Sequence, residues 1–402
     1  MPLFGLAIAY LRRRWGQALL SVLVGALGIA AVATAAIGIE SLPEAAERAW
    51  GGVDLVIGPK GSALDLVLCC ALHLSDPQGL VSEKLAMEAA QHPLIRAAAP
   101  LALGDSVDGW RIVGTTPAIL SIYRATLSSG NVWTAPLEAV LGSRAAQALG
   151  LKPGDTFVGA HGLVAGGEVH SEFPYKVVGV LAPTGSALDR LVLSDIETVR
   201  VIHREHEKEE ATDASTEDRV GNIPNAATAV IASYRSPVAA VLVPRLINAS
   251  PALSAASPSF EIARLMGYFR PVTTAVTGLG LLLVGIAAAG AAAGLMAAMN
   301  ARTRDLALLR ALGARPATLA SVAFAEAGML ALGALTLGAG LTAILMIFAE
   351  HLLANRSGLL LVAHLDFERT AYIVAGAISV AFIAAAFPAL RASRASIEEL
   401  LQ

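Results

Sequence analysis

Residues 16–39 read GQALLSVLVGALGIAAVATAAIGI, an apolar run without a single charged side chain. A helix needs about 20 mainly apolar residues to cross the roughly 30 Å hydrocarbon core of a bilayer. The run therefore predicts a transmembrane helix. A cleaved signal peptide is the alternative, because three arginines at 12–14 precede the run and small residues at 31–33 could form a cleavage site. Signal peptides have apolar cores of about 7–15 residues, so the greater length of this run favours a retained helix.

The composition of the whole chain is typical of a membrane protein. Of its 402 residues, 55% are hydrophobic and only 15% are charged, and the mean hydropathy is +0.63. Soluble domains contain about 25% charged residues. The net charge of -3 also lacks the basic footprint of nucleic-acid-binding proteins, so nucleic acid is not expected as a partner.

Three further segments are long and apolar enough to cross a membrane, at 272–299, 316–349 and 371–390. The segment 316–349 contains one ionisable residue, Glu326, and an intramembrane carboxylate is a functional candidate. A residue that reaches the membrane interface is the alternative. Small residues let helices pack closely in lipid, which predicts packing against each other or against a second copy for a set of glycines: Gly25, Gly28, Gly285, Gly290, Gly294, Gly333 and Gly338.

Arginines near the ends of these spans predict the orientation of the chain, because Lys and Arg accumulate on the cytoplasmic side. The loop at 350–370 has only Arg356 and Arg369. The segment before the first span, the loop 300–315 and the tail after the fourth span together contain nine arginines: Arg12, Arg13, Arg14, Arg302, Arg304, Arg310, Arg315, Arg391 and Arg394. We therefore expect a multi-pass protein of the bacterial inner membrane with both termini in the cytoplasm. The cytoplasmic parts would be an amphipathic segment at 1–15, the loop 300–315 and the tail 391–402, and the external parts would be 40–270 and 350–370.

The insert at 40–270 is large enough to form a hydrophobic core of its own. Short β-like runs alternate in it with helical stretches, which predicts a mixed α/β domain in the periplasm. Residues 149–155, LGLKPGD, read as a helix end followed by a turn into a strand. The expected strands are 53–58, 111–114, 175–181, 190–193 and 227–233, and the expected helices are 82–91, 144–149 and 236–247.

A polar segment at 203–210, HREHEKEE, combines histidines with carboxylates. His203 and His206 could bind a borderline metal such as zinc, but a solvated loop is the alternative. No pattern brings the domain's other histidines, at 73, 161 and 170, to the same place. The adjacent Cys69 and Cys70 cannot form a disulfide framework and are interpreted as small core residues.

No catalytic motif is present in the sequence. Neither the phosphate-binding pattern G-x-x-x-x-G-K-[ST] nor the hydrolase pattern G-x-S-x-G occurs. We therefore expect no catalytic residues, no ATP site and no enzyme activity in this chain.

The loop between the second and third spans reads NARTRDLALLRALGARP from Asn300 to Pro316. Leu306, Leu309 and Leu312 recur at helical spacing with charges between them, and Gly313 is suited to end the helix. Such a short amphipathic helix could bind in the groove of a partner protein. An interfacial helix that only holds two spans in place is the alternative.

This loop resembles the coupling helix of the MacB/FtsX-like permeases, the mechanotransmission class (type VII) of ABC transporters, whose motif is approximately R-R-R-E-I-G-L-L-R-A-L-G-A. Asp305 stands where that motif has Glu, and 308–314 match closely. Glu326 corresponds to a carboxylate that the family often has early in the third span. The ending FPALRASR at 387–394 and the order of one helix, a large domain and three helices are also similar. The resemblance assigns contact with the ATPase to Arg302, Arg304, Asp305, Leu306, Leu309, Arg310, Leu312 and Gly313.

A narrower resemblance comes from DLVIGPKGS at 54–62 and PSFEIARL at 258–265. These are similar to a bacterial subgroup of the family with a D-L-V-V-G-A-K-G-S motif, whose members often have a His-rich loop near the position of His203 and His206. The family resemblance implies a homodimer on two copies of a separate ATPase, which holds the ATP and Mg²⁺. It further implies export or extraction of a lipoprotein, peptide or other amphiphile. The alternatives are a signalling lever that activates a periplasmic cell-wall hydrolase and a zinc-linked transport system, and a periplasmic adaptor is a further candidate partner.

Overall fold

The computed structural model describes residues 8–9, 11–162, 172–202, 225–301, 315–356 and 367–394. The contacts within the chain divide it into two compact units. We call the first the helical unit and the second the domain. The helical unit takes residues 1–42, 268–352 and 361–402, and the domain takes 43–267 and 353–360.

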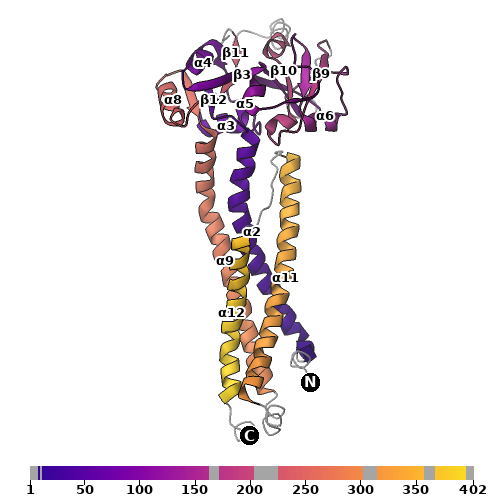
Figure 1. Ribbon diagram of the computed structural model, residues 1–402, viewed down its shortest axis with the longest axis vertical. Helices are drawn as coiled ribbons and strands as arrows, with labels where there is room; N and C mark the ends of the chain where they lie inside the picture. The colour runs from indigo at the N-terminus through magenta and orange to yellow at the C-terminus, as the bar shows by residue number, and fades with distance from the viewer. Residues whose placement is uncertain are drawn as a thin grey trace, which may run out of the picture. The chain divides into compact units, whose positions relative to one another are not determined.

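The helical unit is built from long apolar helices (Figure 1). They are α2 (Trp15–Trp50), α9 (Pro258–Asn300), α11 (Pro316–Arg356) and α12 (Phe367–Arg394). Within the described residues, four helices are long and apolar enough to cross a membrane, which confirms the predicted fold class. α9 has 43 residues, and at 1.5 Å per residue it is about 65 Å long, roughly twice the thickness of the hydrocarbon core. Residues of both α2 and α9 fall in both units, and each helix contains a proline close to the division, Pro43 in α2 and Pro271 in α9.

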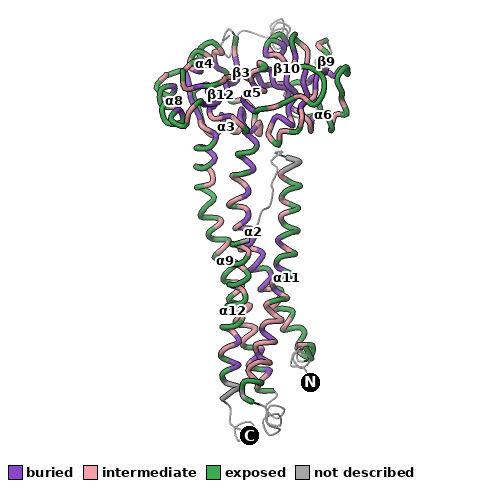
Figure 2. The backbone as a smooth tube through the Cα atoms, in the orientation of Figure 1, coloured by how far each residue is buried: buried purple, intermediate pink, exposed green. Residues whose placement is uncertain are grey.

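α2 is the central helix of the helical unit. In its most apolar window 44% of the residues are buried, against 11–17% in the other three candidate spans, and Figure 2 shows α9, α11 and α12 mostly exposed or half-buried. Glycines let the neighbouring helices approach α2 closely, because they have no side chain at the contact. A Cβ atom at Gly28 would lie 2.6 Å from the carbonyl oxygen of Gly280, and one at Gly338 would lie 3.0 Å from the side chain of Ile29. A Cβ atom at Gly285 would have no described neighbour within 4 Å, so this glycine does not pack against the other described helices of the chain, and packing against a second copy stays a prediction.

The domain contains an eleven-stranded mixed sheet with the order β13-β1-β12-β3-β4-β10-β6-β9-β5, with β7 on β9 and β8 on β3. The pairs β4–β10 and β6–β9 are parallel, and the other pairs are antiparallel. The strands are β1 (Leu55–Pro59), β3 (Ile95–Val107), β4 (Trp110–Thr115), β5 (Leu127–Gly130), β6 (Glu138–Leu141), β7 (Thr156–Phe157), β8 (Ala160–His161), β9 (Tyr175–Leu181), β10 (Val192–Asp195), β12 (Ala229–Tyr234) and β13 (Leu253–Ala256). A separate pair joins β2 (Val81–Ser82) to β11 (Ala226–Ala227).

Short helices cover the sheet, and the alternation of side chains along β1 separates two hydrophobic cores. Leu55 and Ile57 belong to one core, together with residues of α4 and α8. Val56 belongs to the other, together with residues of α3 and α5. The helices are α3 (Ala63–Cys70), α4 (Glu83–Ala90), α5 (Ala118–Tyr123), α6 (Ser143–Leu149), the 3-10 helix η1 (Ala187–Arg190) and α8 (Ala239–Asn248).

The end of α2 and the start of α9 belong to the core that contains Val56. Ala49 and Trp50 of α2 and Ile262 of α9 are all buried in it. Burial of an apolar side chain stabilises a domain by about 1.5–3 kcal/mol. The last turns of α2 and the first turns of α9 are therefore structural parts of the domain.

Two turns of the domain have a clear local cause. α6 ends at Leu149, and Gly150 continues with φ 69°, a left-handed conformation that suits glycine. The Lys152 amide then donates to Asp155 at 2.8 Å and β7 follows, as predicted for 149–155. In the second turn, the buried carboxylate of Asp189 accepts three hydrogen bonds of 2.8 Å, from the amide and hydroxyl of Thr184 and the amide of Gly185.

Candidate functional site

The predicted coupling segment lies outside the described residues, which stop at 301 and resume at 315. α9 ends just before this segment and α11 begins just after it. All the residues assigned to ATPase contact fall in the gap, so their role stays a prediction: Arg302, Arg304, Asp305, Leu306, Leu309, Arg310, Leu312 and Gly313. His203 and His206 also lie outside the described residues, in 203–224.

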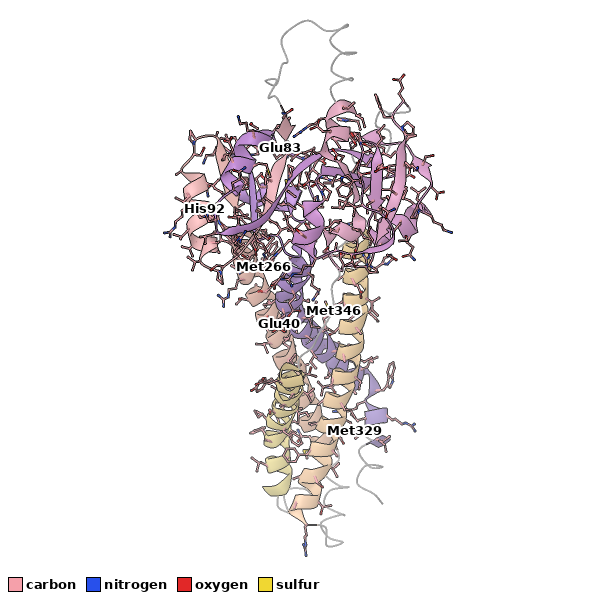
Figure 3. All side chains as sticks on the ribbon, turned by 45° about the horizontal axis from the view of Figure 1, so that its top comes forward. Glu40, Glu83, His92, Met266, Met329 and Met346 are labelled. Atoms are coloured by element: carbon pink, nitrogen blue, oxygen red, sulfur yellow. The ribbon has the colours of Figure 1, made fainter. Side chains whose placement is uncertain are left out.

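The described residues on either side of 203–224 are joined through Arg200. Its guanidinium pairs with the carboxylate of Glu83, which is labelled on α4 in Figure 3. The same side chain donates to the carbonyl oxygen of Ala226 at 3.3 Å. The two ends of the histidine-containing segment are thus held at one place, on β2, β11 and α4.

The described part of the domain offers no metal site. In it, no three His, Cys, Asp or Glu side chains are close enough together to hold a metal ion. His161 is 55% exposed and lies 3.4 Å from the buried carboxylate of Asp105. A zinc site would therefore need ligands from residues outside the described ranges.

Arg111 is a buried arginine with polar and thiol side chains near it. The Arg111 side chain is 5% exposed and donates to Asp76 at 3.0 Å. Burial, together with the positive charge of Arg111, lowers the pKa of His73 to about 3, so this imidazole is neutral at physiological pH. The hydrogen bond between Cys69 and Cys70 lowers the pKa of Cys69 and raises that of Cys70.

These thiols are core residues, as predicted. Cys69 is 3% and Cys70 0% exposed, and both are free cysteines. A reactive thiol needs access to its partner as well as a lowered pKa. Without that access, the group around Arg111 is interpreted as part of the domain's interior.

Glu326 is the one predicted site residue that the structure describes. It lies in the third turn of α11 and is 5% exposed. The side chain is enclosed by the helical unit, and both its functional role and the alternative of a residue at the membrane interface stay predictions. A buried carboxylate in a membrane helix is costly and is kept where it has a function.

Glu326 lines a hollow between α2, α9 and α11 together with Arg14 and Gln17. Arg14 donates from Nη1 to the carbonyl oxygen of Gly294 at 2.8 Å. Gly294 has no side chain, and a Cβ atom there would lie 2.8 Å from Nε2 of Gln17. This glycine therefore lets Arg14, directly before α2, and Gln17 of α2 lie against α9 in the hollow that Glu326 also lines. Sequence reasoning missed Arg14 and Gln17 in this role, because Arg14 was read only as a marker of orientation.

Comparison with protein families gives two matches that do not overlap. Residues 18–230 match the MacB-like periplasmic core domain, and residues 276–397 match the FtsX-like permease C-terminal region. The first match alone covers more than half of the chain. A search of curated proteins found no match.

Two of the solved structures that are similar to this chain are external domains of transporters. The periplasmic region of MacB from Actinobacillus actinomycetemcomitans is 15% identical with a TM-score of 0.33, over 54% of this chain and 94% of that chain. The extracellular domain of the noncanonic ABC-type transporter YknZ from Gram-positive bacteria is 10% identical with a TM-score of 0.31, over 50% of this chain and 98% of that chain. The family assignment rests on the two sequence matches and on the four long helices with the large α/β domain between the first and second. On these grounds the chain belongs to the MacB/FtsX-like family of ABC transporter permeases.

Proposed function

We propose that this chain couples ATP hydrolysis on a separate ATPase to movements of its periplasmic domain, and so exports or extracts a lipoprotein, peptide or other amphiphile. Permeases of this family work with an ABC ATPase. The observation that carries the proposal is that the FtsX-like match, 276–397, includes the amphipathic loop at 300–315. The chain acts in this proposal as a homodimer on two ATPase subunits and holds no nucleotide itself.

α9 provides the physical connection for such coupling. It begins at Pro258, buries Ile262 in the domain core and continues to Asn300, directly before the proposed coupling helix. Each turn of an α-helix is hydrogen-bonded to the next, except at Pro271 of α9, which has no N–H to donate. We infer that a displacement of residues 300–315 on the ATPase reaches the domain through this one helix.

The proposed topology places both termini and 300–315 in the cytoplasm and the domain in the periplasm. It is supported by the arginines near the ends of the spans. A test uses single cysteines at Asp213 and Thr303 in a chain whose two native cysteines are replaced by serine. A membrane-impermeant thiol reagent added to whole spheroplasts should label the cysteine at 213 and spare the one at 303. Labelling of 303 alone would overturn this topology.

The coupling role is tested by Leu309→Asp. On a helix, Leu309 shares a face with Leu306 and Leu312, whereas Ala311 lies about 200° away from Leu309 at 100° per residue. We expect L309D to abolish stimulation of the ATPase while the domain stays folded, and the matched variant A311D to retain stimulation. Equal stimulation in L309D and the unaltered protein would reject the coupling helix.

The proteins captured with the permease distinguish transport from signalling. The tagged permease is crosslinked in its native membrane, and the products are identified by mass spectrometry. Lipoproteins, peptides or an export adaptor captured with an ATPase support transport. A cell-wall hydrolase captured with an ATPase supports the signalling alternative, and absence of any ATPase refutes both.

A zinc role for His203 and His206 stays a separate proposal. Imidazole nitrogen is a frequent zinc ligand, and Arg200 holds the two ends of their segment together. Zinc titration of the full chain by calorimetry should lose a binding event in the H203A/H206A double variant. An unchanged titration would exclude these two ligands.

A further inference from the structure

The helix α8 of the domain is apolar on two faces. One face is buried in the core through Ala239, Val243 and Ile247. The other, which we call the outer face, carries four large apolar side chains that are 56%, 56%, 46% and 59% exposed: Val238, Val241, Leu242 and Leu246. α8 packs on β13, the edge strand of the sheet, at the outer end of the domain (Figure 1). A helix that is apolar all round is normally covered on all sides, and exposed apolar patches mark interaction sites.

Arg245 lies within the outer face. At about 100° per residue, the four apolar side chains fall within about 140° of the circumference of the helix, and Arg245 lies in the same sector, about 20° from Val238. Its side chain is exposed. No hydrogen bond or ion pair of this side chain is found among the residues that the structure describes. The outer face thus presents a guanidinium with unused donors between apolar side chains.

Further positive charge lies at both ends of α8. Arg235 comes shortly before the helix, and Lys60 donates to the carbonyl oxygen of Asn248, its last residue, at 3.0 Å. Residues 235–250 contain no Asp or Glu. A surface that complements the outer face is therefore apolar and acidic.

We propose that the outer face of α8 binds a helix of a different protein, one whose apolar face carries a carboxylate that pairs with Arg245. Arginine is enriched at protein interfaces and in their most important contacts, and its fork of N–H groups matches a carboxylate. Apolar side chains on both partners exclude water around that pair. The inference goes beyond the proposed function, because the partner is neither the ATPase nor the cargo.

The charges of the outer face argue against a second copy of this chain as its occupant. In a symmetric dimer, a surface patch meets the same patch of the other copy. Two outer faces would bring Arg235, Arg245 and Lys60 of one copy close to the same cations of the other. Since residues 235–250 supply no carboxylate, these charges would stay uncompensated.

The position of Arg245 argues against a lipid surface. Helices that lie on a membrane keep their cations on the polar face and insert the apolar face. The face of α8 opposite the outer face is buried in the domain core, so insertion would carry Arg245 into the lipid together with Leu242 and Leu246. A charged side chain is costly there, and an acyl chain offers it no hydrogen-bond acceptor.

The test is site-specific photocrosslinking of the full chain in its native membrane, with a photoreactive amino acid at position 242. Mass spectrometry identifies the residue of the partner that is crosslinked. We expect one protein, crosslinked at a helix with a carboxylate among apolar side chains. Arg245→Glu should lower the yield at least tenfold, because two carboxylates then face each other in a desolvated contact. The matched control, Lys152→Glu, makes the same charge change at an exposed residue outside α8 and should leave the yield unchanged.

A charge exchange separates recognition of Arg245 from mere proximity. When the partner's carboxylate is replaced by lysine, crosslinking to R245E should recover, and crosslinking to the unaltered chain should fall. Protection of the buried thiols at 69 and 70 from a thiol reagent reports folding, and Arg245→Gln, which removes the charge without reversing it, should lower the yield as well.

The proposal fails if R245E and R245Q crosslink the same protein as well as the unaltered chain does. It also fails if the only products contain lipid or a second copy of this chain, or if no product forms. None of these measurements involves the ATPase, so such a result leaves the coupling proposal unaffected.

Discussion

The crossing of α2 and α9 permits a sharp test of how the helical unit is packed. Gly28 and Gly280 face each other there without side chains. A Cβ atom at Gly28 would lie 2.6 Å from the carbonyl oxygen of Gly280 and 2.9 Å from the backbone nitrogen of Val284. Ordinary contacts begin at 3.4 Å, so Gly28→Ala forces the backbones apart by about 0.8 Å. Gly38 on the same helix has no neighbour within 4 Å, and Gly38→Ala is therefore the matched control.

The expected magnitude follows from the difference between these variants. Replacing Gly by Ala in a helix stabilises it by about 1 kcal/mol, and this gain applies at both positions. Overpacking costs about 1–3 kcal/mol and applies only at Gly28. We therefore expect G28A to be less stable than G38A by about 1–3 kcal/mol, which is about 5- to 150-fold in the equilibrium constant of unfolding.

The assay is unfolding in mixed micelles by sodium dodecyl sulfate, followed by the loss of helical circular dichroism. G28A should unfold at a lower fraction of dodecyl sulfate than G38A. The native thiols at 69 and 70 are buried in the domain, so their protection from a thiol reagent should be the same in both variants. Coincident unfolding curves would show that α2 and α9 do not cross in contact at Gly28.

Three further predictions concern the domain. The pKa of His73 is lowered in the folded state, so the unfolded state binds the proton first and stability falls as pH falls below 6.5. Between pH 6.5 and 5 the protonation of His73 in the unfolded state lowers the free energy of unfolding by up to about 2 kcal/mol, and His73→Gln should abolish this decrease. A urea midpoint that falls with pH equally in H73Q and in the unaltered protein would contradict the prediction. Asp189→Ala removes three hydrogen bonds from a partly exposed turn and should lower the free energy of unfolding by about 1–3 kcal/mol, measured by the same urea titration; an unchanged midpoint would argue against it. Cys70→Ala should raise the pKa of the Cys69 thiol, measured by thiolate absorbance, because its main hydrogen-bond partner is lost.

The sequence predicts the spans well because a membrane imposes a minimum length on any helix that crosses it. It also predicts β9 and α6, where side-chain periodicity and a glycine cap are local signals. It misses β3, whose sequence IRAAAPLALGDSV is rich in alanine. Strand formation there depends on pairing with β12 and β4, and such nonlocal contacts override the weak β-propensity of alanine.

The hollow lined by Glu326, Arg14 and Gln17 shows the same limit at the candidate site. Glu326 could be singled out from sequence because a carboxylate in a membrane span is rare. Its neighbours Arg14 and Gln17 could not, since they are separated from it by some 310 residues of sequence and meet it only because α2 packs against α9 and α11. Gly285 shows the same limit, because the position of a glycine in a span does not reveal whether its face of the helix packs against the other helices of the chain.

Glu326 is the residue at which the proposed coupling can be tested within the membrane helices. If its carboxylate anchors the coupling helix, Glu326→Gln should reduce stimulation of the ATPase when the variant and the unaltered protein are assayed in nanodiscs of the same lipid. The charge is removed while the side chain keeps its size, so a packing defect does not imitate this result. Stimulation equal to that of the unaltered protein would refute the anchoring role.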